Sequence, residues 1–401
     1  MNALLSRRAV LAGTAAIASV GRRARAQTGA PIRFGVLADE TGPYAASSGP
    51  GASLAARMAV ADFGPSVIGL PIEVLHADTQ NKPDVASTIA RRWFDQDGVD
   101  AITDLPVTPV AIAVQQVARE KTRSVMITGA AVTEFTTKFC APISSHWTDD
   151  NNALAVGTGG AVIANGGKSW FFITVDIAFG KALQAQTTDI VDKAGGKVVG
   201  STTFPIGTTD FSALLVQAQN AGAEVIGLVA VGGELVNLVK QAGEFGLGAS
   251  GKTLAGFLVY ITDIHALGLN VAAGLTYTSG FYWDMNPGAH AWSERYFQTA
   301  KAMPSKEQAY VYVSVLHYLK AIAQAGTRDP LAVNKAMRAM PVDYFGTPAS
   351  LRSDGRFMHD LTLYRVKKPS ESHGPWDYLQ EVRTIPAGEA FLPEMASCKL
   401  S

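Results

Sequence analysis

The sequence predicts an α/β protein of two lobes with a ligand cleft between them. Apolar strand-like runs alternate with helix-like segments as far as the stretch Ile143–Gly159, and the alternation starts afresh at Lys168. A hydrophobic content of 47% with 39 glycines fits buried sheets with many tight turns between strands and helices. Because ligands of open α/β sheets bind beyond the strand ends, we expect the function to lie in the cleft.

The first 26 residues have the features of an export signal. Arg7 and Arg8 precede a small and apolar run of about twelve residues, which is too short to span a bilayer as a helix. Ala24–Ala26 has the small-x-small form of a cleavage site, and Ser6–Leu11 resembles a twin-arginine signal. We therefore predict export to the periplasm, by the twin-arginine route or alternatively the general one, with cleavage after Ala26.

Cleavage there leaves about 375 residues, the usual size of two domains. Five of the 34 basic residues lie in the signal, so 29 remain against 34 acidic residues. This negative balance disfavours a nucleic-acid partner. After the signal no run reaches the roughly eighteen apolar residues of a membrane-spanning helix, so we expect a protein that is not embedded in a membrane.

The first lobe begins with a buried strand at Ile32–Ala38. Further strands are predicted at Pro71–Ala77, Val99–Leu105 and Thr122–Thr128, and helices from about Gly51, Asp84 and Thr108. The hydroxyl of Thr108 can cap its helix. Free N–H groups at the turns Pro106–Thr108 and Gly129–Ala131 can cradle a carboxylate, although such turns are common in α/β proteins and mostly empty.

The second lobe repeats the alternation. Strands are expected at Lys168–Val175, Lys197–Phe204, Val225–Val231, Thr253–Val259 and Gly274–Tyr282. Four helices are expected between them: Phe179–Lys193, a helix capped by Asp210, a helix that ends at Phe245, and Asp263–Leu267. Three helices then follow in succession, at Ala289–Met303, Lys306–Ala325 and Pro330–Met340, before the turn-rich segment Phe345–Phe357 and a strand at Leu361–Val366.

Helices that follow a completed second sheet need a surface to cover, and the first lobe is short of helices. We infer that the chain returns to the first lobe near Trp283–Pro287 and crosses again near Tyr344, so that three crossings form a hinge. The predicted boundaries are residues 27–145 with 284–344 for the first lobe, 146–283 with 345–385 for the second, and 386–401 for a C-terminal tail.

Enzyme signatures do not point to a reaction. There is no Gly-x-Ser-x-Gly elbow and no Gly-x-Gly-x-x-Gly after a strand, and no histidine has metal-ligand spacing to another histidine or cysteine. We therefore expect no catalytic residue, no metal and no cofactor. The alternative is a hydrolase that uses acids at the strand ends, namely Asp39, Glu40, Asp104 and Asp176. The glycines at 157–160 are predicted to lie in a helix and to permit close packing.

The order of several segments along about 350 residues is informative. These segments are Ile32–Leu37 with Thr41-Gly42-Pro43, Gly51–Phe63, Ile127–Thr136, Asp176 with Phe179-Gly180, Thr209-Asp210-Phe211, the Ala-Gly-Ala-Glu-Val before Val231, and Lys240-Gln241-Ala242. In this order they resemble the periplasmic solute-binding proteins of ABC transporters, of the branched-chain amino-acid-binding (Leu/Ile/Val-binding) type. Cys140, His146–Thr148, Gly280–Asp284 and Cys398 resemble a proteobacterial subgroup. The resemblance implies a type I periplasmic binding protein, with two doubly wound α/β lobes on a three-strand hinge.

The resemblance also implies where a ligand binds. Amino-acid-binding members hold the α-carboxylate with a hydroxyl pair after the third strand and a threonine after the fourth, which correspond here to Val107 with Thr108 and to Ala131. Their ammonium is held by a tyrosine and a glutamate of the second lobe, which correspond to Val231 and the apolar stretch Phe257–Val259. The aromatic residue before the lobe-two glycine is Phe179, which has no hydroxyl.

These differences favour a ligand without an ammonium group, because an unpaired buried charge costs several kcal/mol. We expect a carboxylate with an aromatic or aliphatic body, such as a benzoate, a phenylpropanoid derivative or a short fatty acid, packed between Tyr44, Phe179 and Phe257. Asp176 can either accept from a ring hydroxyl or cap a helix. The predicted ligand-binding residues are Tyr44, Ser47, Val107, Thr108, Gly129, Ala130, Ala131, Asp176, Phe179, Val231, Phe257 and Leu258. A branched-chain amino acid is the alternative ligand.

The resemblance implies a transport receptor that closes on its ligand and presents both lobes to the membrane permease of an ABC transporter, as a monomer and without chemistry of its own. A ligand sensor of the same fold, which signals to a regulator or chemoreceptor, is the alternative. The two cysteines, Cys140 and Cys398, can form one disulfide in an exported protein or remain two buried thiols.

Overall fold

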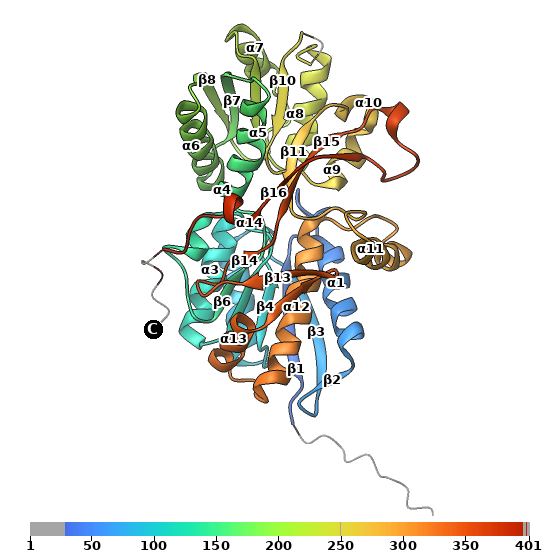
Figure 1. The fold of residues 1–401 in the computed structure, drawn as a ribbon. Coiled ribbons are helices and arrows are strands. Elements are labelled where there is room, and N and C mark those ends of the chain that lie inside the picture. The colour runs from blue at the N-terminus through green and yellow to red at the C-terminus, as the bar shows by residue number, and fades with distance from the viewer. Residues whose placement is uncertain (1–28, 249, 396–397, 399–401) are drawn as a thin grey trace, which may run out of the picture.

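The structure is a computed structural model that describes residues 29–248, 250–395 and 398. The chain forms two lobes, one above the other in Figure 1, and each lobe is built on its own mainly parallel sheet. The predicted α/β class with two sheet-based lobes is thereby confirmed. The predicted export signal, residues 1–26, lies outside the described residues.

The first lobe, the lower one in Figure 1, contains a six-stranded sheet of order β2-β3-β1-β4-β5-β6. Its strands are β1 (Ile32–Ala38), β2 (Ser66–Val67), β3 (Leu70–Asp78), β4 (Ala101–Asp104), β5 (Ser124–Ile127) and β6 (Ser144–His146). All neighbours are parallel except the hairpin pair β2 and β3. Because β1 pairs with both β3 and β4, the strand order reverses there and a crevice opens beyond the carboxyl ends of β1 and β4.

Helices from both ends of the chain cover this sheet. They are α1 (Gly49–Phe63), α2 (Pro83–Asp95), α3 (Thr108–Lys121), α11 (Pro287–Ala300), α12 (Lys306–Ala325) and α13 (Pro330–Ala339). Helix α12 packs along α1, and its Tyr318 meets Phe34 of β1 edge to face with 5.5 Å between the ring centroids. The three successive late helices therefore lie on the first lobe.

The second lobe contains a seven-stranded sheet of order β16-β15-β11-β10-β9-β7-β8. Its strands are β7 (Ser169–Val175), β8 (Lys197–Phe204), β9 (Val225–Val229), β10 (Thr253–Gly256), β11 (Thr276–Ser279), β15 (Leu361–Val366) and β16 (Leu379–Ile385). Strands β7 to β11 are parallel, and β15 and β16 add an antiparallel edge. Because β7 pairs with both β8 and β9, this lobe has a crevice of its own beyond the strand ends.

The second lobe starts with one continuous helical segment, made of α4 (Asn151–Leu154), a π-helical turn (Ala155–Gly159) and α5 (Gly160–Ala164). The other helices are α6 (Ala178–Lys193), α7 (Ser212–Asn220), α8 (Gly233–Glu244), α9 (Ile261–Leu267) and α10 (Leu269–Ala272). A Cβ atom on Gly157 would lie 2.4 Å from Oγ1 of Thr278 in β11. Glycine thus permits the close packing of this helix on the sheet, as predicted.

The segment expected to be turn-rich is an antiparallel sheet of β12 (Pro341–Tyr344), β13 (Thr347–Leu351) and β14 (Phe357–Met358). Its side chains Val342, Leu351 and Phe357 are buried in the same apolar cluster as α12 and α13. They keep the segment on the first lobe, so the third crossing lies between β14 and β15 instead of near Tyr344. Strands β6 and β16 were not predicted. The N-cap position of α7 is Phe211, but Oδ1 of Asp210 accepts a hydrogen bond of 2.9 Å from the backbone N–H of Ser212, the first residue of the helix, and so satisfies a free donor at the helix start.

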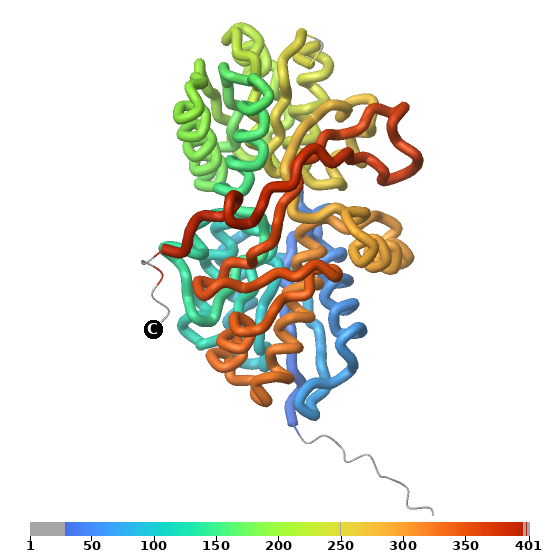
Figure 2. Tube along the Cα trace, in the orientation of Figure 1, coloured from blue at the N-terminus to red at the C-terminus, as the bar shows by residue number. Residues whose placement is uncertain are grey.

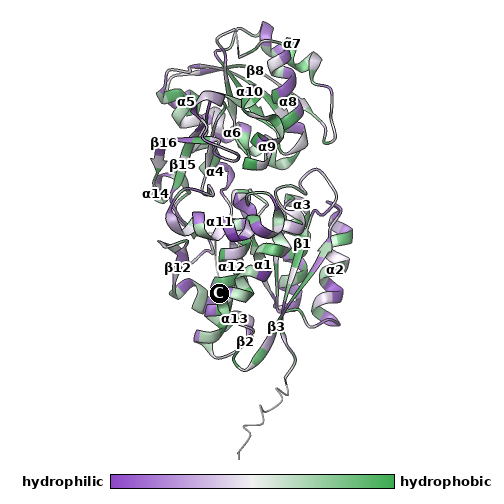
Figure 3. Ribbon diagram, turned by 90° about the vertical axis from the view of Figure 1, so that its right-hand side faces the viewer, coloured by the Kyte–Doolittle hydropathy of each residue, from purple (hydrophilic) through white to green (hydrophobic). Residues whose placement is uncertain are grey.

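Apolar side chains fill the space between each sheet and its helices. In Figure 3 the strands are mostly green, and purple hydrophilic residues gather on outer helices such as α2 and α11. Among the described residues no helix has the length and apolarity that a bilayer crossing requires.

The three crossings of the hinge meet at one buried carboxylate, that of Asp149. This residue follows β6 on the first crossing, accepts a hydrogen bond of 3.1 Å from the backbone N–H of Gly280 on the second, and lies 3.4 Å from Nε2 of His359 on the third. From α12, Nζ of Lys306 at 2.8 Å and the hydroxyl of Tyr310 at 2.6 Å donate to it. The side chains of Asp149 and Lys306 are 0% and 1% exposed, so water does not reach this ion pair.

The C-terminal strap, defined here as residues 386–395 with Cys398, returns from the second lobe to the first (Figure 2). Its helix α14 (Ala387–Ala390) packs beside α4, where Nδ2 of Asn152 donates to the carbonyl of Ala390 at 2.7 Å. Nη1 of Arg352 on the first lobe donates to the carbonyl of Leu392 at 2.8 Å. Cys398 forms a disulfide with Cys140, with 5.7 Å between their Cα atoms. The strap is thus a fourth connection between the lobes.

Candidate functional site

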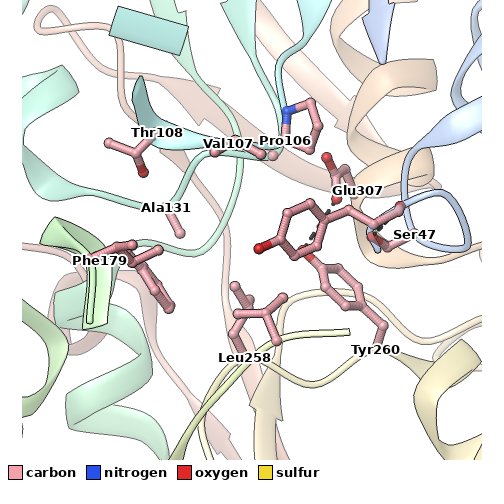
Figure 4. A pocket seen from close by; sticks show the side chains of 13 residues that line it. Ser47, Pro106, Val107, Thr108, Ala131, Phe179, Leu258, Tyr260 and Glu307 are labelled. Carbon is pink, nitrogen blue, oxygen red and sulfur yellow. Dashed lines mark hydrogen bonds between the residues drawn. The ribbon is translucent and has the colours of Figure 1, made fainter. Parts of the chain in front are cut away.

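A pocket lies between the lobes, where the carboxyl ends of strands from both sheets face each other (Figure 4). It is lined by Tyr44, Ser47, Pro106, Val107, Thr108, Gly129, Ala131 and Glu307 of the first lobe and by Ile177, Phe179, Val231, Leu258 and Tyr260 of the second. The empty space between these residues and at the mouth is about 420 Å³.

One end of the pocket offers backbone N–H groups, which we call the N–H cradle. Thr108 at the start of α3 and Ala131 after β5 line the pocket, and the N–H of Val110 belongs to the same first turn of α3 as that of Thr108. None of the three donates to an acceptor among the described residues. Free N–H groups at a helix start, together with the helix dipole, favour an anion. The cradle can therefore hold a carboxylate without a charged side chain.

The hydroxyl of Thr108 does not cap α3, contrary to the sequence prediction. Val107 takes the extended N-cap conformation, with φ −113° and ψ 129°, and Thr108 becomes the first helical residue. Pro109, the second residue, has no N–H that needs an acceptor. The Thr108 hydroxyl consequently remains available beside the cradle.

The middle of the pocket is apolar. Val107 of the first lobe faces Ile177, Phe179, Val231 and Leu258 of the second. These side chains can enclose a hydrocarbon or aromatic body, and such burial contributes about 25 cal/mol for each Å² removed from water.

The other end of the pocket is acidic. Glu307, in the first turn of α12, is 1% exposed, and its Oε2 accepts a hydrogen bond of 3.2 Å from the hydroxyl of Tyr260 across the cleft. Its Oε1 lies so close to Gly129 that a Cβ atom there would come within 2.0 Å. Figure 4 shows Glu307, Tyr260 and Ser47 on the side of the pocket opposite Thr108.

Asp104 lies behind Glu307 at the end of β4. It is fully buried, and its Oδ2 accepts a hydrogen bond of 2.5 Å from the hydroxyl of Ser48. Burial and the neighbouring Glu307 raise the pKa of Asp104 well above its usual range, and burial also raises the pKa of Glu307. Because the two carboxyl groups are buried neighbours, they favour holding one proton between them over carrying two negative charges.

The backbone that presents Asp104 is strained. Asp104 and Leu105 have φ values of +80° and +66°, in the left-handed region that residues with a side chain rarely adopt. Each such residue costs on the order of 1–3 kcal/mol, and strain of this kind clusters at functional sites.

The pocket brings together most of the predicted ligand-binding residues: Tyr44, Ser47, Val107, Thr108, Gly129, Ala131, Phe179, Val231 and Leu258. The structure places the others elsewhere. Ala130 is buried behind the cradle, and its carbonyl accepts from Nε2 of His146 at 2.7 Å.

Phe257 and Asp176 do not face the pocket. Phe257 is 0% exposed and packs against Trp170 and Phe172 in the core of the second lobe, because successive residues beyond β10 point to opposite sides and Leu258 takes the cleft side. Asp176 forms an ion pair of 2.7 Å with Lys181 at the surface, so it is neither a helix cap nor a pocket residue in this structure.

The sequence analysis named Pro106 only as part of a turn and did not predict that it lines the pocket. It did not single out Ile177, Tyr260 or Glu307 at all. The sequence analysis expected no partner for an ammonium group, but the structure brings an acid, Glu307, into the pocket from α12 of the first lobe. A signal was present: the helix Lys306–Ala325 is apolar nearly all round, which predicts burial, so its charged first turn must be buried and partnered as well.

The acids expected at strand ends do not form a catalytic pair with one another. Asp39 accepts from two backbone N–H groups of its own loop, both at 2.8 Å, and Glu40 pairs with His76 at 2.7 Å. Only Asp104 approaches the pocket, with Glu307 as its neighbour. Among the described residues no group of histidines, cysteines and acids could hold a metal ion.

Residues 246–253 have the Gly-x-x-x-x-Gly-Lys-Thr spacing of a phosphate-binding loop. Such a loop binds phosphate when it follows a strand and opens a helix, whereas this segment follows α8 and leads into β10. Nζ of Lys252 donates to the carbonyl of Ala223 at 2.6 Å. The segment is a connection between a helix and a strand and does not indicate a nucleotide site.

Comparison with known proteins gives a consistent set of relatives. The model of the periplasmic binding protein family matches residues 31–372. A solved periplasmic binding protein from Burkholderia mallei is 44% identical, with a TM-score of 0.88 and coverage of 92% of this chain and 99% of that one. A branched chain amino acid ABC transporter periplasmic ligand-binding protein from Burkholderia xenovorans LB400 is 35% identical, with a TM-score of 0.84 and coverage of 92% and 100%.

More distant proteins share the fold or part of the sequence. A solute binding protein of an ABC transporter from R. palustris, solved in complex with 4-hydroxybenzoate, is 22% identical, with a TM-score of 0.81 over 89% of this chain and 97% of that one. The Leu/Ile/Val-binding protein homolog 6 of Brucella melitensis biotype 1 is 25% identical over 253 residues, which are 61% of this chain and 63% of the relative. The match thus spans less than two thirds of that curated relative.

Proposed function

Because the chain belongs to the periplasmic binding protein family, on the branch of the Leu/Ile/Val-binding homologues, we propose that it captures a small carboxylic acid in its cleft and delivers it to the membrane permease of an ABC transporter. The signal-like residues 1–26 favour export, so the mature chain is expected to act in the periplasm, as a monomer and without chemistry of its own.

The observation that carries the proposal is the combination of the N–H cradle with an apolar wall. The free N–H groups of Thr108, Val110 and Ala131 suit a carboxylate, and Phe179 and Leu258 suit an aromatic or aliphatic body. The complex of the R. palustris protein with 4-hydroxybenzoate supports an acid of this size in a pocket of this fold.

A branched-chain amino acid is the second candidate, and Glu307 is the observation that favours it. A buried carboxylate in the pocket could balance the ammonium of an amino acid. The names of the Burkholderia xenovorans and Brucella relatives point in the same direction.

A thermal-shift panel should separate the two candidates. We expect benzoate, hydroxybenzoates, phenylpropanoid acids or short fatty acids to raise the melting temperature of the purified protein in a concentration-dependent way, because a ligand that binds only the folded state stabilises it by about 2.7 kcal/mol at a hundredfold excess over Kd. Mass spectrometry of compounds released on denaturation provides an independent identification. Strong stabilisation by leucine or valine, with none by the acids, would contradict the proposal.

Substitution of Gly232 by alanine should weaken binding of the best acid of this panel by at least about tenfold, which corresponds to about 1.4 kcal/mol. Gly232 precedes α8, has φ +57°, and a Cβ atom there would lie 2.7 Å from the carbonyl oxygen of Pro43 on the opposite lobe. The added methyl group therefore opposes closure of the cleft. Isothermal titration calorimetry measures the change.

The matched control is Gly246→Ala at the other end of α8. Gly246 has φ +69° and no atom within 4 Å of an added Cβ, so it shares the positive φ without a contact across the cleft. Binding by this variant should stay within about twofold of the unmodified protein. Equal losses in both variants would mean that strain, and not closure, decides the result.

A further inference from the structure

We propose that Glu307 accepts a hydrogen bond from a hydroxyl group of the ligand, so that the acid taken up is a hydroxy acid whose hydroxyl lies away from its carboxylate. This inference rests on the proposed function, because the carboxylate must occupy the N–H cradle for the hydroxyl to reach the acidic end.

Glu307 has acceptor capacity that the protein leaves unused. A carboxylate offers about four lone-pair positions. Tyr260 donates to Oε2 at 3.2 Å, and Oε1 has no hydrogen-bond donor among the described residues. The side chain is 1% exposed, so bulk water does not fill the remaining positions. A buried acceptor left without a donor costs about 1–3 kcal/mol, which a ligand donor would recover.

The surroundings of Glu307 favour a neutral donor over an ammonium group. The ammonium of Lys306 lies 5.6 Å from the ring centroid of Tyr260, whose hydroxyl donates to Glu307, so a positive charge already lies near the acidic end. An ammonium group also has three N–H donors that need acceptors when buried, whereas a hydroxyl group has one. The free acceptor positions of Glu307 therefore suit the single O–H of a hydroxyl group better than the three N–H groups of an ammonium.

Asp104 is a positioning residue in this scheme. It touches Glu307 and not the ligand, and its place is fixed by Ser48, by its own left-handed backbone and by that of Leu105. A proton shared between Asp104 and Glu307 would orient the Glu307 carboxylate toward the pocket. The strained backbone at the end of β4 fits this role, because strain of this kind persists where the surrounding structure fixes a residue for function.

The test compares ligands that differ only in the donor. Calorimetry should give dissociation constants for benzoate, 4-fluorobenzoate, 3-hydroxybenzoate and 4-hydroxybenzoate. We expect at least one hydroxybenzoate to bind about tenfold or more tightly than benzoate, because hydrogen bonds to charged groups contribute about 1.5–3 kcal/mol. Fluorine occupies space similar to a hydroxyl but cannot donate, so 4-fluorobenzoate should show no such gain.

Variants then assign the preference to Glu307. In Glu307→Gln the ratio of the benzoate and hydroxybenzoate dissociation constants should fall to about threefold or less, since a neutral acceptor gains less from a hydroxyl donor. Glu244→Gln, the same change at an exposed position of α8, should keep the ratio. For Asp104, the asparagine variant supplies a permanent N–H donor and should retain the preference, whereas the alanine variant should lose it.

Each outcome has a distinct meaning. If benzoate and both hydroxybenzoates bind the unmodified protein equally, the inference about Glu307 is wrong while the proposed function stands. If leucine binds more tightly than every acid and loses affinity in Glu307→Gln, Glu307 is an ammonium partner and the inference is overturned. If no acid binds at all, the proposed function itself fails. The comparison of ligands on the unmodified protein decides the matter even where a variant does not fold.

Discussion

Replacement of Asp149 by alanine is expected to lower the free energy of unfolding by about 3–5 kcal/mol, the usual cost of leaving a buried partner charge uncompensated. Lys306 is 1% exposed and its ammonium has Asp149 as its ion-pair partner at 2.8 Å. Asp149 also accepts from Tyr310 and Gly280, so its loss removes hydrogen bonds to α12 and to the second crossing at the same time. Urea unfolding followed by tryptophan fluorescence measures the change.

The control is Asp176→Ala. Asp176 also forms an ion pair, with Lys181, but the two side chains are 48% and 67% exposed, and exposed pairs contribute about 0–1 kcal/mol. Where Asp149→Ala does not fold, Asp149→Asn keeps the shape of the side chain, and the double change Asp149→Asn with Lys306→Met should recover part of the loss because no unpaired charge remains. A loss below about 1 kcal/mol in all Asp149 variants would contradict the assigned role.

The same carboxylate makes the protein sensitive to acid. Burial alone would raise the pKa of Asp149, but the ammonium of Lys306 and the hydrogen bond with His359 outweigh burial and hold it well below its usual range. A lowered folded-state pKa contributes stability above the unfolded pKa of about 3.9, and this contribution is lost as the pH falls further. Asp149→Asn should therefore lose less stability than the unmodified protein between about pH 5 and pH 3.

Reduction of the Cys140–Cys398 disulfide is expected to lower the free energy of unfolding by roughly 2–5 kcal/mol, because the bond closes a very long loop and restricts the unfolded chain. The two cysteines are 258 residues apart in the sequence. Cys398→Ser should have the same effect without a reductant. Urea unfolding of the oxidised, reduced and Cys398→Ser proteins gives the comparison.

Adding a reductant to Cys398→Ser is the control, and should change nothing. The strap also contacts the first lobe through the hydrogen bond from Arg352 to the carbonyl of Leu392, so it should stay on the first lobe when the disulfide is open. If the oxidised and reduced proteins unfold at the same urea concentration, the disulfide contributes no stability.

The sequence predicts most of this fold because local patterns decide most of its elements. The strand Ile32–Ala38 and the helix Lys306–Ala325 lie where their apolar patterns place them. Strand β16, in contrast, has exposed residues between its buried ends Leu379 and Ile385, so it carries little apolar pattern and exists because β15 pairs with it. The position of β12 to β14 likewise depends on contacts with α12 and α13 that no local pattern reveals.

The pocket residues in the turns after strands were predictable, because ligands of doubly wound sheets bind beyond the carboxyl ends of the strands. Gly129, Val107 and Phe179 follow this rule. Glu307 was not found, since it enters the pocket from a helix that begins about 160 residues after the first lobe's sheet ends. Phe257 was misplaced because a one-residue shift beyond a strand turns a side chain from the cleft to the core.

The division of the first lobe between distant parts of the chain has a consequence for its synthesis. Strands β1 to β6 are complete at His146, but α12, which covers Phe34, begins only at Lys306, after five strands of the second lobe. At roughly 5–20 residues per second, the apolar face of the first sheet stays bare on the ribosome for on the order of ten seconds or longer. Exposed apolar surface of this kind attracts other chains. The nascent protein should therefore depend on chaperones that shield this face until its last third has been translated.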